Sequence, residues 1–138
     1  MTILVAYDGS GPARKAVEHA FVTYPDEEIV LLRVVEAASG STTAGFDLAR
    51  EYLKDRRDEI AEKGFDEVPE FENPDDVEFS TEVAVGQPAA EIVTFAEDHD
   101  VAHIIVGSHG RTGVSRVLLG SVAERIVRRS PVPVTVVR

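Results

Sequence analysis

Residues 107–121 read GSHGRTGVSRVLLGS and carry the clearest chemical signal in the chain. Gly107, Gly110 and Gly120 are separated by two and nine residues, and Ser121 follows directly. Glycine has no Cβ, so its backbone approaches a phosphate closely, and amides at a helix start attract anions. The segment follows an apolar run and precedes a helical pattern, which predicts a phosphate-binding loop at a strand end. The alternative is that these glycines serve only a tight turn and a close helix contact.

This spacing matches neither of two common phosphate loops. The segment lacks the Gly-Lys-Ser/Thr ending of a P-loop, and it lacks the GxGxxG pattern of dinucleotide-binding folds. The first apolar run ends instead in Asp8, followed by Gly9, Ser10 and Gly11. Asp8 is a candidate acceptor for ligand hydroxyl groups, although Asp before Gly is also a common turn residue. Ser10 is predicted to cap the helix that follows.

Strand-like and helix-like segments alternate along the chain. Five runs rich in β-branched residues predict strands at 2–7, 28–35, 77–85, 101–106 and 132–137. Helical patterns lie between Ser10 and Pro25, over 46–63 and 88–98, and from Ser121 to Pro131. Val122, Ala123, Ile126 and Val127 are predicted to face inward from the last helix.

This alternation predicts one α/β domain over residues 1–138, an open parallel sheet with helices on both faces. Ligands of such sheets bind beyond the carboxyl ends of the strands, near the point where the strand order reverses. Asp8, Val34 and Gly107 all occupy strand ends of this kind, so we expect them to share one site.

Composition excludes several classes of function. The chain has 25 acidic and 14 basic residues, and the net charge of −11 repels nucleic acid and anionic membranes. No apolar run approaches the length of a membrane span, and no secretory leader is visible, so a cytoplasmic location is expected. The absence of cysteine excludes disulfides and thiol chemistry. An acidic, lysine-poor composition predicts a halophilic source.

The four histidines do not have the spacing of a metal site. His103 lies within a predicted strand and is expected to be a packed core residue. His19 and His99 are expected on the surface. His109 lies inside the glycine segment, where its backbone amide is the expected phosphate contact. Arg111 and Arg116 either contact phosphate or are solvated loop residues, and the sequence favours neither.

The chain resembles the universal stress protein family over essentially its full length. The resemblance rests on the ILVAYDGS start, the LLRVV run and the tail from IIVGSHGRTG to PVPVTVV, and the glycine signature resembles that of the family's ATP-binding branch. It implies a Rossmann-like, adenine nucleotide alpha hydrolase-like sheet of strand order 3-2-1-4-5. It also implies a homodimer in which the last strand, Pro131 to Arg138, pairs antiparallel across a two-fold axis.

The resemblance also implies roles for individual residues. Asp8 would hydrogen-bond the ribose, the backbone of Val34 would recognise the adenine edge, and Ala6 would line the same site. The phosphates would lie among Gly107, Ser108, His109, Gly110, Arg111, Thr112, Gly113, Gly120, Ser121, Val122 and Ala123. Mg²⁺ or Mn²⁺ would offset the phosphate charge in this acidic protein.

The leading functional hypothesis is an ATP-binding stress-response or signalling regulator that acts as a homodimer on an unidentified protein partner. No general base, P-loop lysine or catalytic triad accompanies the glycine segment, so no catalytic residue is assigned. AMP and cyclic AMP remain alternative ligands. Two alternative functions also remain: a slow ATPase or an enzyme that phosphorylates its own Ser or Thr, and a dimeric scaffold that binds no nucleotide.

Overall fold

The computed structural model describes residues 1–35, 77–108 and 119–138. These residues form eight elements: β1 (Thr2–Ala6), α1 (Gly11–Thr23), β2 (Glu28–Val35), β3 (Phe79–Val85), α4 (Pro88–Asp98), β4 (Val101–Gly107), α5 (Ser121–Arg129) and β5 (Val134–Val137). The helix predicted over 46–63 lies outside the described residues.

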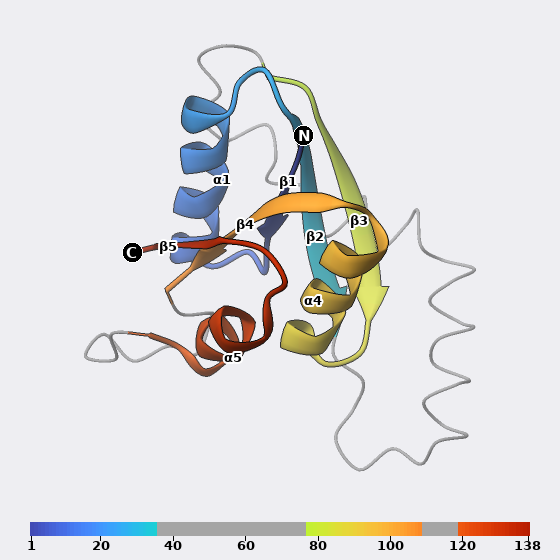
Figure 1. Ribbon diagram of the computed structural model, residues 1–138. Helices are drawn as coiled ribbons and strands as arrows, with labels where there is room; N and C mark the ends of the chain where they lie inside the picture. Colours follow the sequence, from blue (N-terminus) through green and yellow to red (C-terminus); the bar gives the residue numbers. More distant parts are fainter. Residues whose placement is uncertain (36–76, 109–118) are drawn as a thin grey trace.

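The strands form one parallel sheet of order β3-β2-β1-β4-β5, which confirms the predicted fold class (Figure 1). β3 lies at one edge, as its alternating pattern predicts, and β5 lies at the other. β1 is central, and its residues Ile3, Leu4 and Val5 are fully buried. A continuous apolar run of this kind is what a strand covered on both faces requires.

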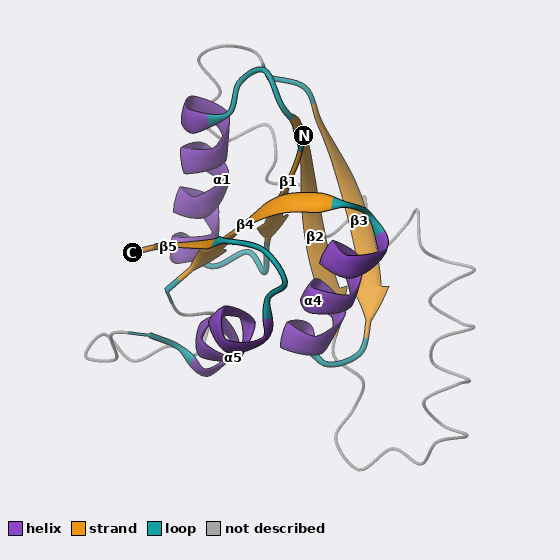
Figure 2. Cartoon of the chain, in the orientation of Figure 1, coloured by secondary structure: helices purple, strands orange, loops and turns teal. Residues whose placement is uncertain are grey.

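The sheet is the middle of three layers. α1 covers one face, and α4 and α5 cover the other (Figure 2). Successive side chains of a strand point to opposite faces, so Ile3 and Val5 pack against α1 while Leu4 and Ala6 face α4 and α5. Among the described residues, no helix is long and apolar enough to cross a bilayer.

Most strand boundaries follow the sequence pattern, and the differences have local causes. β2 has the predicted limits. β3 begins at Phe79 rather than at residue 77, because its pairing with β2 starts there. β5 begins at Val134 rather than at residue 132. The Ser130 hydroxyl accepts from the Val132 N–H (3.1 Å) and donates to the Val132 carbonyl (2.6 Å), which holds that residue in a turn.

The prediction that Val127 faces inward is wrong. In α5, Ala123 and Ile126 are buried, Val122 packs partly against the same core, and Val127 is 46% exposed. Each residue of an α-helix turns about 100° around the axis, so Val122 and Val127 lie on opposite flanks of a stripe centred between Ala123 and Ile126. The core covers the Val122 flank in part and leaves the Val127 flank exposed.

Candidate functional site

The candidate site lies at the carboxyl ends of β1 and β4, which are neighbours in the sheet. From β1 the chain builds the sheet toward β2 and β3, and it then crosses to the other side of β1 to form β4 and β5. The strand order therefore reverses between β1 and β4. Parallel sheets bind their ligands beyond the carboxyl ends of the strands at such a point.

Asp8 lies in the turn between β1 and α1. Its Oδ1 accepts from the Ser10 N–H at 2.9 Å, and Gly9 has a φ of 82°, a conformation that favours glycine. Asp8 therefore has the turn role that its sequence position allows. A carboxylate has two oxygens and accepts several hydrogen bonds, so this role is compatible with a bound hydroxyl group.

The predicted helix cap at Ser10 is confirmed. The Ser10 hydroxyl accepts from the Ala13 N–H at 3.2 Å, and its carbonyl accepts from the Arg14 N–H at 3.0 Å. The hydroxyl satisfies one of the backbone donors that a helix start leaves without a partner. The cap and the Asp8 contact together fix the path of the chain from β1 into α1.

Gly107, the last residue of β4, packs directly against the start of α1. A Cβ at this position would lie 2.8 Å from the Pro12 carbonyl carbon and 3.0 Å from the Ala13 nitrogen. The close packing explains why glycine is required here without any ligand. It also places the first candidate of the glycine segment next to the β1–α1 turn that contains Asp8.

Gly107→Ala is expected to lower the free energy of unfolding by about 1–3 kcal/mol, because a methyl group in this contact forces backbone to move. Thermal or urea denaturation measures the loss. Gly11→Ala is the matched control, since a Cβ there has no heavy atom within 4 Å. Equal stabilities of the two variants would contradict the packing role of Gly107.

Ser108 connects the end of β4 to both β5 and the start of α5. It is 3% exposed, and its N–H donates to the Val137 carbonyl at 2.7 Å. Its carbonyl accepts from the Gly120 N–H at 2.5 Å. The two ends of the glycine segment are thereby held together, although they are twelve positions apart in the sequence. The sequence pattern alone did not show this link.

The start of α5 offers backbone donors at the same edge. Gly120 is the N-cap residue, with φ −69° and ψ 162°, and it has no side chain that could cap the helix. Ser121, Val122 and Ala123 form the first turn, where N–H groups have no partner inside the helix. This arrangement suits an anion such as a phosphate.

The backbone of Val34 points past the end of β1. Leu32 is the last β2 residue paired with β1, and its carbonyl accepts from the Tyr7 N–H at 3.0 Å. The Val35 carbonyl accepts from the Gly86 N–H at 3.0 Å, on the β3 side. Backbone groups alternate between the two sides of a strand, so the N–H and C=O of Val34 are directed like those of Leu32.

The remaining predicted site residues divide into two groups. The side chains of Ala6 and Val34 both pack against the core that α4 and α5 cover, so they lie on the same face of the sheet. His109, Gly110, Arg111, Thr112 and Gly113 lie outside the described residues. The described site residues thus lie on β1, β2, β4 and α5 or within two residues of their ends.

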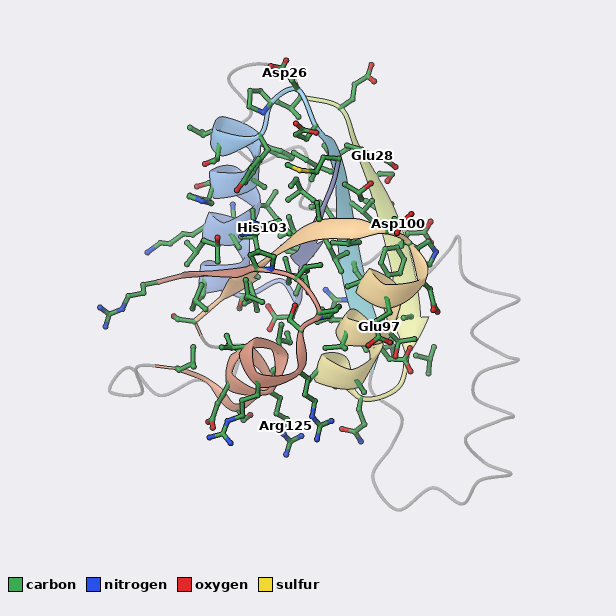
Figure 3. All side chains as sticks on the ribbon, in the orientation of Figure 1. Asp26, Glu28, Glu97, Asp100, His103 and Arg125 are labelled. Carbon is green, nitrogen blue, oxygen red and sulfur yellow. The ribbon has the colours of Figure 1, made fainter. Side chains whose placement is uncertain are left out.

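His103 is half-buried in β4 between α1 and β5, close to the expected packed position. Its Nε2 lies 2.6 Å from Thr135 Oγ1, and its ring centroid is 5.8 Å from that of Tyr24. Figure 3 shows it in the interior of the view, close to β5. His99 is exposed and stacks on Phe95, whereas His19 is half-buried on α1. In the described ranges, no three metal-ligating side chains come together.

Burial lowers the pKa of His103 below its ordinary value of 6.5, and the nearby His19 lowers it further. The unfolded chain therefore binds a proton more readily than the folded chain does. Stability contributed by neutral His103 is present above pH 6.5 and is lost as the pH falls from 6.5 through the lowered folded pKa.

We expect His103→Gln to remove this loss, because glutamine can still hydrogen-bond Thr135 but does not titrate. The measurement is urea denaturation of both proteins across this pH range, with the difference between them reporting His103. A wild-type protein that becomes more stable relative to the variant on acidification would contradict the assignment.

Comparison with known proteins agrees with the fold. The Universal stress protein family model matches residues 1–138. The universal stress protein MJ0531 of Methanocaldococcus jannaschii is 36% identical, with 99% of this chain and 81% of that protein aligned. The solved structure of MJ0577 from the same organism is 33% identical, with a TM-score of 0.70 over 99% of this chain and 94% of that chain.

Other solved structures share the fold. UspA from Lactobacillus plantarum has a TM-score of 0.77 at 26% identity, covering 100% of this chain and 97% of that chain. A universal stress protein solved in complex with cAMP is 22% identical, with a TM-score of 0.66 over 100% of this chain and 97% of that chain. Another, from Archaeoglobus fulgidus and in complex with dAMP, is 20% identical, with a TM-score of 0.63 over 100% and 98%. With the family model spanning the whole chain and relatives above 30% identity aligned along it, this protein belongs to the universal stress protein family.

Proposed function

We propose that this protein binds an adenine nucleotide, with ATP as the physiological ligand, and acts in the cytoplasm as a homodimeric stress-response or signalling regulator. One observation carries the nucleotide proposal. The backbone of Val34 and the first-turn amides of α5 both lie beyond the carboxyl ends of the strands. They are on either side of the point where the strand order reverses. That edge can supply a base-recognition end and a phosphate-binding end.

Each part of ATP has a matching group in this proposal. The C=O and N–H of Val34 accept from the adenine amino group and donate to the neighbouring ring nitrogen. Asp8 accepts from a ribose hydroxyl. The amides of Ser121, Val122 and Ala123 donate to phosphate oxygens, as expected for a helix start. The complexes of family members with cAMP and dAMP support a ligand of this class.

A divalent ion fits the donor groups at this edge. Mg²⁺ and Mn²⁺ prefer oxygen ligands, and the Ser121 hydroxyl, on the first residue of α5, is an oxygen donor that could join the phosphate oxygens around such an ion. Such an ion would supply positive charge next to the triphosphate in a protein of net charge −11. Its role here is electrostatic support of binding.

Calorimetric titration tests the nucleotide proposal. Nucleotide-stripped protein is titrated with ATP, AMP and cyclic AMP in the presence of Mg²⁺ and concentrated KCl, a salt condition suited to the proposed halophilic source. We expect ATP to bind most tightly and Gly110→Trp to abolish that binding. No heat with any nucleotide would favour the scaffold alternative, and steady phosphate release above the level of the Gly110→Trp protein would favour the ATPase alternative.

The homodimer proposal rests on the open edge of β5. The Pro133 carbonyl accepts from the Ile104 N–H at 3.0 Å, and the Val137 carbonyl accepts from Ser108, so these residues face β4. By alternation, the N–H and C=O groups of Val134 and Val136 point outward, where no described strand pairs with them. An apolar open edge of this kind invites pairing with a second strand.

Val136→Pro is expected to convert the dimer to a monomer without unfolding it. Proline removes an outward N–H but leaves the hydrogen bonds to β4 in place, which is the position at which sheets tolerate it. Analytical ultracentrifugation measures the assembly state, and circular dichroism checks the fold. A folded variant that remains dimeric would contradict pairing through β5.

A further inference from the structure

The charges of this acidic protein are unevenly distributed. After residue 108 the sequence contains a single acidic residue, Glu124, and the basic residues Arg111, Arg116, Arg125, Arg128, Arg129 and Arg138. The rest of the chain is therefore even more acidic than the net charge of −11 suggests. Helix α5 is the described element on which basic side chains gather.

Three arginines form one exposed face of α5. Arg125, Arg128 and Arg129 are all exposed, and their spacing of three and four residues places them within about 100° of the helix circumference. The helix rests on the core through Ala123 and Ile126, so this arginine face points away from the sheet. Figure 3 shows Arg125 directed outward, at the opposite end of the molecule from Asp26 and Glu28.

Helix stability explains only part of this face. Arg128 and Arg129 lie in the last turn, where cations interact favourably with the helix dipole. Arg128 also pairs with Glu124 at 2.9 Å, which neutralises part of its charge. Arg125 lies before the last turn, so the dipole does not account for it. A residual positive charge therefore remains on the face, carried chiefly by Arg125 and Arg129.

We propose that the arginine face of α5 is the docking surface for an acidic segment of a partner protein. A guanidinium group can donate two parallel hydrogen bonds to one carboxylate. Three of these groups on one helix face therefore suit a short row of Asp or Glu side chains. This surface is distinct from the proposed nucleotide site, because the nucleotide contacts the first turn of α5 and the arginines follow it.

An extended nucleic acid fits this face less well than a short acidic segment. Nine residues of α-helix span only about 13 Å, and a nucleic-acid strand carries phosphates along its entire length. The neighbouring helix α4 ends in Glu97 and Asp98, both exposed. A long polyanion would extend beyond the arginines over a protein whose remaining charge is strongly acidic, whereas a short acidic segment need not.

The test uses the full-length protein and a fluorescein-labelled peptide of alternating Glu and Ala, with binding followed by fluorescence anisotropy over a series of KCl concentrations at which the protein is folded. We expect the peptide to bind and its affinity to fall as KCl is added. Arg125→Gln and Arg129→Gln are each expected to lower the affinity about threefold or more. Arg128→Gln is expected to have a smaller effect. Glu124→Gln is expected to strengthen binding, because it releases Arg128 from its ion pair.

Matched controls separate this surface from general attraction. Lys15→Gln removes the same charge from an exposed position on α1 and is expected to leave peptide binding unchanged. Excess ATP is expected not to displace the peptide. Thermal melts check that each variant is folded, as expected for exposed side chains.

Several results would overturn the proposal. Absence of peptide binding, equal losses in Lys15→Gln and Arg125→Gln, or displacement by ATP would each remove the arginine face as the docking surface. Tighter binding of a labelled single-stranded DNA through the same arginines would assign the face to nucleic acid instead. Self-association that is lost in Arg125→Gln would assign it to a second copy of this chain.

Discussion

Ser121→Pro is expected to weaken ATP binding about ten- to a hundredfold while leaving the fold intact. Ser121 is the first residue of α5, where proline is well tolerated because the N–H it lacks has no partner inside the helix. Gly120 has φ −69° and ψ 162°, the extended conformation that a residue before proline adopts. The substitution therefore removes a proposed phosphate donor with little cost to folding.

The expected loss follows from the strength of hydrogen bonds to charged groups. Such a bond contributes about 1.5–3 kcal/mol, and 1.4 kcal/mol corresponds to a factor of ten in affinity. Ser121→Ala is the matched control, since it removes the hydroxyl and retains the amide. Titration calorimetry with ATP gives the affinities, and urea denaturation gives the stabilities. A stable Ser121→Pro protein that binds ATP as tightly as Ser121→Ala does would exclude this amide from phosphate binding.

The second large effect concerns the base. Inosine triphosphate is expected to bind about a hundredfold more weakly than ATP, although its ribose and phosphates are identical. Hypoxanthine has a carbonyl where adenine has an amino group and an N–H where adenine has an acceptor nitrogen. Both contacts with the backbone of Val34 would then face a group of the wrong kind, at about 1–3 kcal/mol for each group left without a partner.

This experiment needs no substitution, so it is independent of folding defects. Competition of inosine triphosphate against labelled ATP gives the ratio of affinities, and free triphosphate measures what the phosphate contacts contribute alone. Equal affinities for the two nucleotides would mean that Val34 does not recognise the base edge. The proposed phosphate contacts of Ser121 and its neighbours would be unaffected by that result.

The arrangement of the sheet was predictable from the sequence because its signals are local or shared by the family. Five apolar runs marked the strands, and the limits of β2 were predicted correctly. Ser10 before Gly11 and Pro12 predicted the cap of α1, and the Ser10 hydroxyl makes it. The strand order came from the family resemblance, because composition and periodicity do not determine which strands are neighbours.

Contacts between distant segments were not predictable. The glycine spacing predicts a phosphate contact for Gly107, but its tightest neighbours are Pro12 and Ala13 at the start of α1. The partner of His103 was not identified either, because Thr135 becomes its neighbour only when β5 pairs with β4. Helical periodicity puts Val122 and Val127 on opposite flanks of one stripe, and it does not show that Val127 stays 46% exposed.

The site was predictable in its location but not in its construction. Asp8, Val34 and Gly107 could be assigned to one edge because parallel strands all end there. The direction of the Val34 backbone depends on the register of β2 against β1, which places its groups past the last pair. The two hydrogen bonds of Ser108 depend on the positions of β5 and α5. Register and packing of this kind emerge only from the three-dimensional structure.

The most direct test of the central claim is an amide spectrum of the isotopically labelled protein recorded during titration with Mg²⁺ and ATP. The account predicts that the largest chemical-shift changes occur at Val34, Ser121, Val122 and Ala123, on the carboxyl edge of the sheet. Amides at the opposite edge, such as Glu28 and Glu78, are expected to change little. Saturable shifts confined to that opposite edge, or no shifts at all, would contradict the proposed nucleotide site.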